Sequence, residues 1–133
     1  MKPHVLDANA LYRFLTGGAG AEIVGRLFKD ARNANQRLSM SVINWGEVYY
    51  TIAKGVGFAE AANIMDRVKL LPLAILPADE LMTAAAARIK AGHGLPYADC
   101  FAAVLAGTEG VLVTSDVKDF KKIPRLQILA LPT

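Results

Sequence analysis

Four acidic residues stand apart from the other charges of this 133-residue chain. They are Asp7, Glu47, Asp99 and Asp116, and each is the only charged residue within a stretch that is otherwise apolar or neutral. An ionised carboxylate among side chains bound for a core costs several kcal/mol unless it is paired, hydrogen-bonded or bound to a metal. No Lys or Arg lies in these stretches to neutralise the acids locally. The pattern therefore favours a fold that gathers the four carboxylates around a cation.

Carboxylates in this number suit a hard divalent cation, Mg²⁺ or Mn²⁺. A zinc site is disfavoured because His4 and His93 are the only histidines and neither has a partner at ligand spacing. Cys100 is the single cysteine, so no disulfide framework is expected. The sequence contains neither a GxxxxGK[ST] loop nor a GxGxxG fingerprint, which argues against a nucleotide cofactor. A carboxylate-bound Mg²⁺ activates water for attack on a phosphodiester, and that is the chemistry we expect.

The three aspartates also have a purely structural interpretation. An Asp between a strand and a helix is a normal N-cap, and an Asp in a first helical turn interacts favourably with the helix dipole. Glu47 fits that interpretation less well, because it is expected about a turn inside a helix with no charged neighbour before Lys54. A shared site explains all four acids together, whereas caps explain them one at a time.

The apolar pattern alternates short β-like runs with helix-period segments, as in an α/β domain. The expected strands are residues 4–6, 38–41, 73–76, 111–113 and 127–130. The expected helices are residues 10–15, 23–32, 42–54, a segment carrying Ile64, Met65, Val68 and Leu71, a helix capped by Asp79 and closed at 92–94, and a helix over 96–106. We predict a single domain over residues 1–133, with a five-stranded parallel sheet flanked by helices on both faces.

In this frame the four acids fall at one edge of the sheet. Asp7 follows the first strand and Asp116 follows the fourth, so the two carboxylates meet if these strands are neighbours. Glu47 and Asp99 lie early in the helices at residues 42–54 and 96–106, about one turn from the same edge. Sites in open parallel sheets form outside the carboxyl ends of the strands, where all four acids can converge.

Composition favours a cytoplasmic protein with an anionic partner. No uncharged apolar run approaches the ~20 residues of a membrane span, and the N-terminus lacks the apolar region of a signal peptide. The net charge is +3, but setting aside the four isolated acids leaves 8 acidic residues against 15 basic ones. Such an excess suits nucleic acid, although a solvated basic surface explains it equally well.

Four segments of the chain resemble the PIN-domain nucleases, and most closely the VapC-type toxins of toxin–antitoxin pairs. The first two are Val5-Leu6-Asp7-Ala8-Asn9-Ala10-Leu11 and Ser41-Val42-Ile43-Asn44-Trp45-Gly46-Glu47-Val48. The others are Leu95-Pro96-Tyr97-Ala98-Asp99-Cys100-Phe101-Ala102-Ala103 and the most specific, Leu112-Val113-Thr114-Ser115-Asp116-Val117-Lys118-Asp119-Phe120 with Ile123-Pro124-Arg125-Leu126. The resemblance extends over nearly the whole chain, with one departure: Ala8 stands where many members have a polar residue.

The resemblance implies a PIN-like fold and an Mg²⁺- or Mn²⁺-dependent endoribonuclease. Asp7, Glu47, Asp99 and Asp116 would be the catalytic, metal-binding quartet, Asn9 and Thr114 would orient them, and Asp119 would be auxiliary. The family also implies a cognate antitoxin that restrains the toxin, an RNA substrate and a homodimer. Beside these residues, a basic cluster just after Asp116 is a candidate to hold RNA phosphates; it comprises Lys118, Lys121, Lys122 and Arg125.

Three other classes of protein fit the sequence less well. A non-catalytic PIN domain that only binds RNA or protein remains the main alternative, although an intact quartet argues against it. A receiver domain would need a phosphorylatable Asp after the middle strand, where this chain has Pro77-Ala78. A haloacid-dehalogenase-like phosphatase would need Asp-x-Asp after the first strand, where it has Asp7-Ala8-Asn9.

Overall fold

The structure, a computed structural model, describes residues 2–133 and contains a five-stranded sheet at its centre. Met1, the first residue of the expected domain, lies outside the described residues. All strand pairings are parallel, and the order across the sheet is β3-β2-β1-β4-β5. The strands are β1 His4–Leu6, β2 Leu38–Ser41, β3 Leu73–Leu76, β4 Val111–Thr114 and β5 Gln127–Ala130. The first and fourth strands are therefore neighbours, as convergence of the acids requires.

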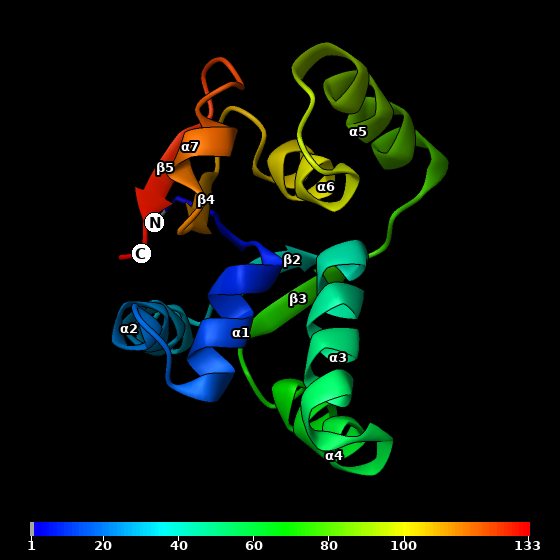
Figure 1. Cartoon of the computed structure of the whole chain (residues 1–133). Helices are drawn as coiled ribbons and strands as arrows, with labels where there is room; N and C mark the ends of the chain where they lie inside the picture. The colour runs from blue at the N-terminus through cyan, green and yellow to red at the C-terminus, as the bar shows by residue number, and fades with distance from the viewer. Residues whose placement is uncertain (1) are drawn as a thin grey trace.

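Helices connect the parallel strands and cover both faces of the sheet (Figure 1). Their bounds are α1 Ala8–Thr16, α2 Ala21–Asn33, α3 Val42–Val56, α4 Phe58–Val68, α5 Glu80–His93, α6 Tyr97–Ala106 and α7 Val117–Phe120. The connection from β3 to β4 crosses the sheet and carries α5 and α6 to the face opposite α1 and α2 (Figure 1). Strand order reverses at β1 and β4, which is where parallel sheets open a crevice for a site.

Side-chain alternation along the strands divides the interior into two cores. Leu6 and Val113 point to a core shared with α1 to α4, whereas Val5 and Leu112 point to a core shared with α6 and α7. All four side chains are at most 2% exposed, as expected for strands that are covered on both faces. The helix α3 contacts both α1 and α6, so it joins the two layers beside the carboxyl ends of the strands.

The predicted fold class is confirmed, while some helix boundaries were wrong. The fourth helix ends at Val68, so Leu71, which we assigned to it, lies in the turn before β3. The short helix α7 was not predicted, because four residues are too few to show a helical period. None of the helices in residues 2–133 is long and apolar enough to cross a bilayer.

Candidate metal centre

Asp7 and Thr114 link the carboxyl ends of the two central strands. The Thr114 hydroxyl donates a 2.5 Å hydrogen bond to Asp7 Oδ2 and accepts one of 2.9 Å from the backbone N–H of Asp116. Asp7 Oδ1 accepts the N–H of Ala10 at 2.8 Å and so caps α1. Asp7 is 4% exposed and Thr114 is fully buried. The hydrogen bonds of the Thr114 hydroxyl thus hold the turn after β1, which carries Asp7, against the turn after β4, which carries Asp116.

Asp116 and Asp119 are brought together by α7. Asp116 Oδ1 accepts the N–H of Asp119 at 3.3 Å, so Asp116 caps this helix. One carboxylate oxygen from each of Asp99, Asp116 and Asp119 lies within 4.8 Å of the others. These three residues form the tightest group of potential metal ligands in residues 2–133. Asp119 therefore lies closer to the centre than its predicted auxiliary role suggested.

Glu47 reaches the centre from α3, and a buried asparagine holds it. Asn44 Nδ2 donates to Glu47 Oε1 at 3.0 Å and to the main-chain oxygen of Ala98 at 3.1 Å. Ala98 precedes Asp99 in the first turn of α6, where Pro96 rather than Asp99 occupies the capping position. Asn44 was not among the predicted site residues, although a neutral polar residue three positions before Glu47, in an apolar helix, is a usable signal in the sequence.

The carboxylates influence one another electrostatically. Burial raises the pKa of Asp99 from its usual 3.8 to about 7, and the charges of Asp7, Glu47, Asp116 and Asp119 act in the same direction. Burial also raises the pKa of Asp7, to about 6, against the hydrogen bonds from Thr114 and Ala10 that favour the ionised form. All four predicted acids and Asp119 thus lie within electrostatic reach of one another at one edge of the sheet.

The other predicted residues occupy the rim. Asn9 is exposed and its Oδ1 accepts a 2.7 Å hydrogen bond from Ser115 on the turn after β4. The four basic residues after Asp116 are all exposed: Lys118, Lys121, Lys122 and Arg125. Lys122 Nζ lies 3.4 Å from Asp119 Oδ1, so at least one of these cations approaches the acidic group directly.

The donor set fits a divalent cation of the Mg²⁺ or Mn²⁺ type. It consists of carboxylates, and the described residues bring no histidine or cysteine into the group of potential ligands. Three oxygens within 4.8 Å repel one another when ionised, and a cation would relieve that repulsion. The same repulsion adds to the effect of burial on the pKa of Asp99, and no basic group appears among its perturbing charges. The centre is chemically suited to bind a metal ion.

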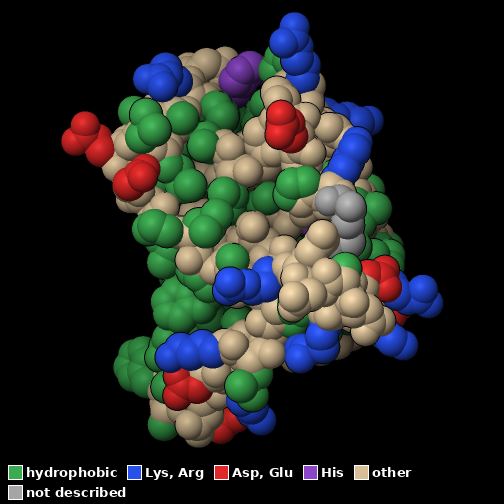
Figure 2. All heavy atoms as spheres, turned by 180° about the vertical axis from the view of Figure 1, so that it is seen from behind, with side chains coloured by type: hydrophobic (Ala, Val, Ile, Leu, Met, Phe, Trp, Pro, Cys, Tyr) green, Lys and Arg blue, Asp and Glu red, His purple; other side chains and the backbone are tan. Residues whose placement is uncertain are grey.

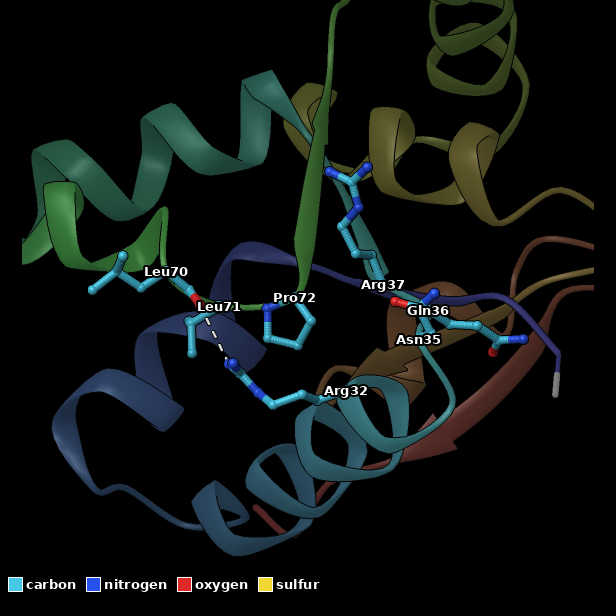
Figure 3. A pocket seen from close by; sticks show the side chains of 7 residues that line it. All are labelled: Arg32, Asn35, Gln36, Arg37, Leu70, Leu71 and Pro72. Carbon is cyan, nitrogen blue, oxygen red and sulfur yellow. Dashed lines mark hydrogen bonds between the residues drawn. The ribbon is translucent and has the colours of Figure 1, made fainter.

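A hollow of about 370 Å³ lies at the edge of the sheet opposite the acidic centre (Figure 3). It is lined by Arg32, Asn35, Gln36, Arg37, Leu70, Leu71 and Pro72, next to the first residues of β2 and β3. Arg32 Nη2 donates to the main-chain oxygen of Leu70 at 3.3 Å. The Arg37 guanidinium points away from the Arg32 side chain (Figure 3). None of the acids of the centre lines this hollow, so we do not assign the chemistry to it.

The fold and the acidic centre define a class of small α/β domains with carboxylates grouped at the carboxyl ends of parallel strands. The family model of the PIN domain matches residues 4–126. The chain therefore belongs to the PIN domain family. Among curated proteins, no sequence matches significantly.

Solved structures with the same fold include several toxin–antitoxin proteins. DNA-bound VapBC from Salmonella typhimurium superposes with a TM-score of 0.75 at 21% identity, covering 98% of both chains. VapBC2 from Rickettsia felis, bound to a promoter fragment, gives 0.71 at 20% identity, covering 96% of this chain and 98% of that one. Mycobacterium tuberculosis VapC20, a sarcin-ricin loop cleaving toxin, gives 0.59 at 14% identity, covering 77% and 80%. These likenesses establish the shared fold.

Proposed function

We propose that residues 1–133 form a single PIN domain that acts as a metal-dependent endoribonuclease, the toxin of a type II toxin–antitoxin pair. The observation that carries the proposal is the convergence of carboxylates from α3, α6 and the turns after β1 and β4. Of these, Asp7, Glu47, Asp99 and Asp116 are the proposed metal-binding and catalytic residues, with Asp119 beside them. Helix capping accounts for Asp7 and Asp116 separately, but it does not explain why Glu47 and Asp99 lie at the same edge of the sheet.

In this mechanism, a bound Mg²⁺ or Mn²⁺ would supply an activated water and would neutralise charge on the phosphoryl oxygens. Asp99, Asp116 and Asp119 would hold the ion, and Asp7 and Glu47 would add further carboxylates to the donor set. Thr114 fixes Asp7 relative to Asp116. Asn9, held by Ser115, presents a polar amide at the rim. The rigid turns after β1 and β4 keep these groups in place before substrate binds.

RNA is the proposed substrate because the rim of the centre is basic. Lys118, Lys121 and Arg125 are exposed within nine residues of Asp116 and can contact phosphates on either side of the scissile bond. The similar fold of VapC20, which cleaves the sarcin-ricin loop, supports the same substrate class. RNA phosphate would compete with Asp119 for the Lys122 ammonium group.

An antitoxin and a second copy of the chain are the proposed protein partners, and the cytoplasm is the proposed location. The similar structures from Salmonella typhimurium and Rickettsia felis are both VapBC complexes. Hydrophobic side chains gather along one side of the face in Figure 2, and Tyr50, Val56, Phe58 and Leu81 on α3, α4 and α5 are more than half exposed. Exposed apolar surface of this kind is typical of protein interfaces.

The test is cleavage of total RNA by purified protein with Mg²⁺ or Mn²⁺, with EDTA and Asp99→Asn as negative controls. We expect cleavage in the wild type and its loss in both controls, because Asp99 contributes an oxygen to the tightest acidic group. The matched control is Glu109→Gln, which removes an exposed acid before β4, at the amino end of that strand. Its cleavage should equal that of the wild type.

The alternative is a PIN domain that binds RNA or protein without cutting. It would be favoured if the folded wild type failed to cleave any RNA and failed to bind Mn²⁺ in a calorimeter. Mn²⁺ binding without cleavage of total RNA would instead point to a nuclease of narrow specificity, and ribosomal and transfer RNA would then be tested separately.

A further inference from the structure

Asn44 is a polar side chain that the proposed nuclease mechanism does not use. It lies in the first turn of α3 and is fully buried. Asparagine is a weak helix former, and a buried amide gains little unless all its polar atoms are bonded. In this chain its Oδ1 has no hydrogen-bond partner, and within residues 2–133 it is the one such buried side-chain atom. The fold alone would be served as well by an apolar residue, which suggests that the Nδ2 group has a separate purpose.

The two bonds made by Nδ2 identify that purpose. One goes to Glu47 Oε1, one turn further along α3, and the other crosses to the main-chain oxygen of Ala98 in α6. In the described part of the chain, Glu47 makes no other side-chain hydrogen bond, and Asp99, next to Ala98, makes none. The Asn44 amide therefore connects the Glu47 carboxylate to the backbone of Ala98, the residue before Asp99.

We propose that Asn44 is a positioning residue of the metal centre, which fixes the Glu47 carboxylate and locks the first turn of α3 to that of α6. The inference rests on the proposed metal-dependent function and deepens it. With Oε1 held by the amide, Oε2 of Glu47 remains free to face the cation. Hydrogen bonds of this kind orient metal ligands, and their removal typically lowers metal affinity about 10- to 100-fold.

The test measures Mn²⁺ affinity by titration calorimetry on metal-free protein, together with the melting temperature. Asn44→Leu has a similar shape without a donor, and Asn44→Ala is the second variant in case leucine disturbs packing. We expect either variant to bind Mn²⁺ about 10- to 100-fold more weakly than the wild type while remaining folded at the temperature of the titration.

The matched control is Thr51→Val on the same helix. The Thr51 hydroxyl donates to the main-chain oxygen of Glu47 at 2.8 Å and not to its carboxylate. This control should leave Mn²⁺ affinity unchanged, because the carboxylate keeps its amide partner.

Three results would overturn the proposal. If both Asn44 variants fold and bind Mn²⁺ as tightly as the wild type, and only their melting temperature is lower, Asn44 is a purely structural residue. An equal reduction of affinity in Thr51→Val would trace the effect to α3 in general. Folded wild-type protein that does not bind Mn²⁺ at all would refute the metal-dependent function itself, and the positioning of Glu47 for a metal with it.

Discussion

Individual carboxylates of the centre serve the fold and the proposed chemistry at once. Asp7 caps α1 and Asp116 caps α7, so the expected capping role of these two residues is confirmed. A carboxylate has about four lone-pair sites, and a cap uses only one of them. Asp99 is different, because it caps no helix and makes no side-chain hydrogen bond among the described residues. It is the acid whose position is hardest to explain without a cation.

The raised pKa values of Asp7 and Asp99 predict how the stability of the metal-free protein responds to pH. The pKa values of Asp7 and Asp99 are raised in the folded state, so between about pH 4 and 7 the folded protein binds more protons than the unfolded chain. The free energy of unfolding should therefore fall as the pH rises through this window. The contribution of Asp7, which is almost fully buried, is about 3 kcal/mol. Urea unfolding in EDTA across this range would measure it.

Asp99→Asn isolates the second contribution. At pH 8 the metal-free variant should be more stable than the wild type by about 2 kcal/mol, which discounts the full shift because Asp99 is only half buried. The advantage should shrink toward pH 4, where the wild-type carboxyl is protonated. Glu109→Gln should show no such trend. If Asp99→Asn were no more stable at pH 8, repulsion among the carboxylates would not be a significant cost in the metal-free state.

Among the secondary-structure elements, the decisive pair is β1 and β4. Their carboxyl ends carry Asp7 and Asp116, and the Thr114 hydroxyl bonds to both residues across the gap. The next turn, α7, then places Asp119 beside Asp116. Helices α3 and α6, which contact each other, supply the remaining two acids.

Thr114→Val should therefore lower the free energy of unfolding by more than its small change in size suggests. Valine keeps the shape but leaves Asp7 Oδ2 and the N–H of Asp116 without their partner in a buried site. We expect a decrease of about 2–3 kcal/mol in the free energy of unfolding, measured by urea denaturation, and weaker Mn²⁺ binding. Thr83→Val removes a hydroxyl that bonds to the main-chain oxygen of Asp79 near the surface, and its effect should stay within about 0.5 kcal/mol. Equal decreases in the two variants would contradict a special role for Thr114.

Over the whole molecule, basic residues outnumber the acidic residues that lie outside the centre. Five of the 12 acidic residues lie in or beside the centre, which leaves seven acids against the 15 basic residues of the chain. On the face shown in Figure 2, Lys and Arg side chains are spread over the surface beside the apolar area. A small acidic centre in a basic surface would attract a polyanion while reserving the centre for a cation.

RNA binding should accordingly depend on salt. The cleavage-deficient Asp99→Asn protein should bind a fluorescent single-stranded RNA more weakly as salt rises, which anisotropy would measure. Replacing Lys121 and Arg125 with alanine should reduce the slope of log K against log salt by about 0.7 for each phosphate that is no longer neutralised. Lys69→Ala, which removes a cation paired with Asp66 at 3.4 Å on another surface, should leave the slope unchanged. An unchanged slope in the Lys121 and Arg125 variant would exclude this cluster as the RNA-binding surface.

Much of this architecture was predictable because it depends on local pattern. Alternating apolar runs and helical periods gave the α/β class, the five strands and the helices that cover them. The isolation of Asp7, Glu47, Asp99 and Asp116 gave the candidate acids, and the structure places them at one edge of the sheet; their role as metal ligands stays a prediction. The role of Asn9 beside them is likewise still a prediction.

The remaining features depended on contacts between residues far apart in the chain. Asp119 joins the tightest acidic group because α7 turns it toward Asp99, 20 positions away, and a four-residue helix leaves no period in the sequence. The role of Asn44 depends on the contacts of its amide with Glu47 and Ala98, which lie on two different helices. Residue type and spacing specified most of the elements and the four isolated acids. Which acids lie closest and what holds them depended on the folded structure, because hydrogen bonds and charge repulsion depend on distance in space.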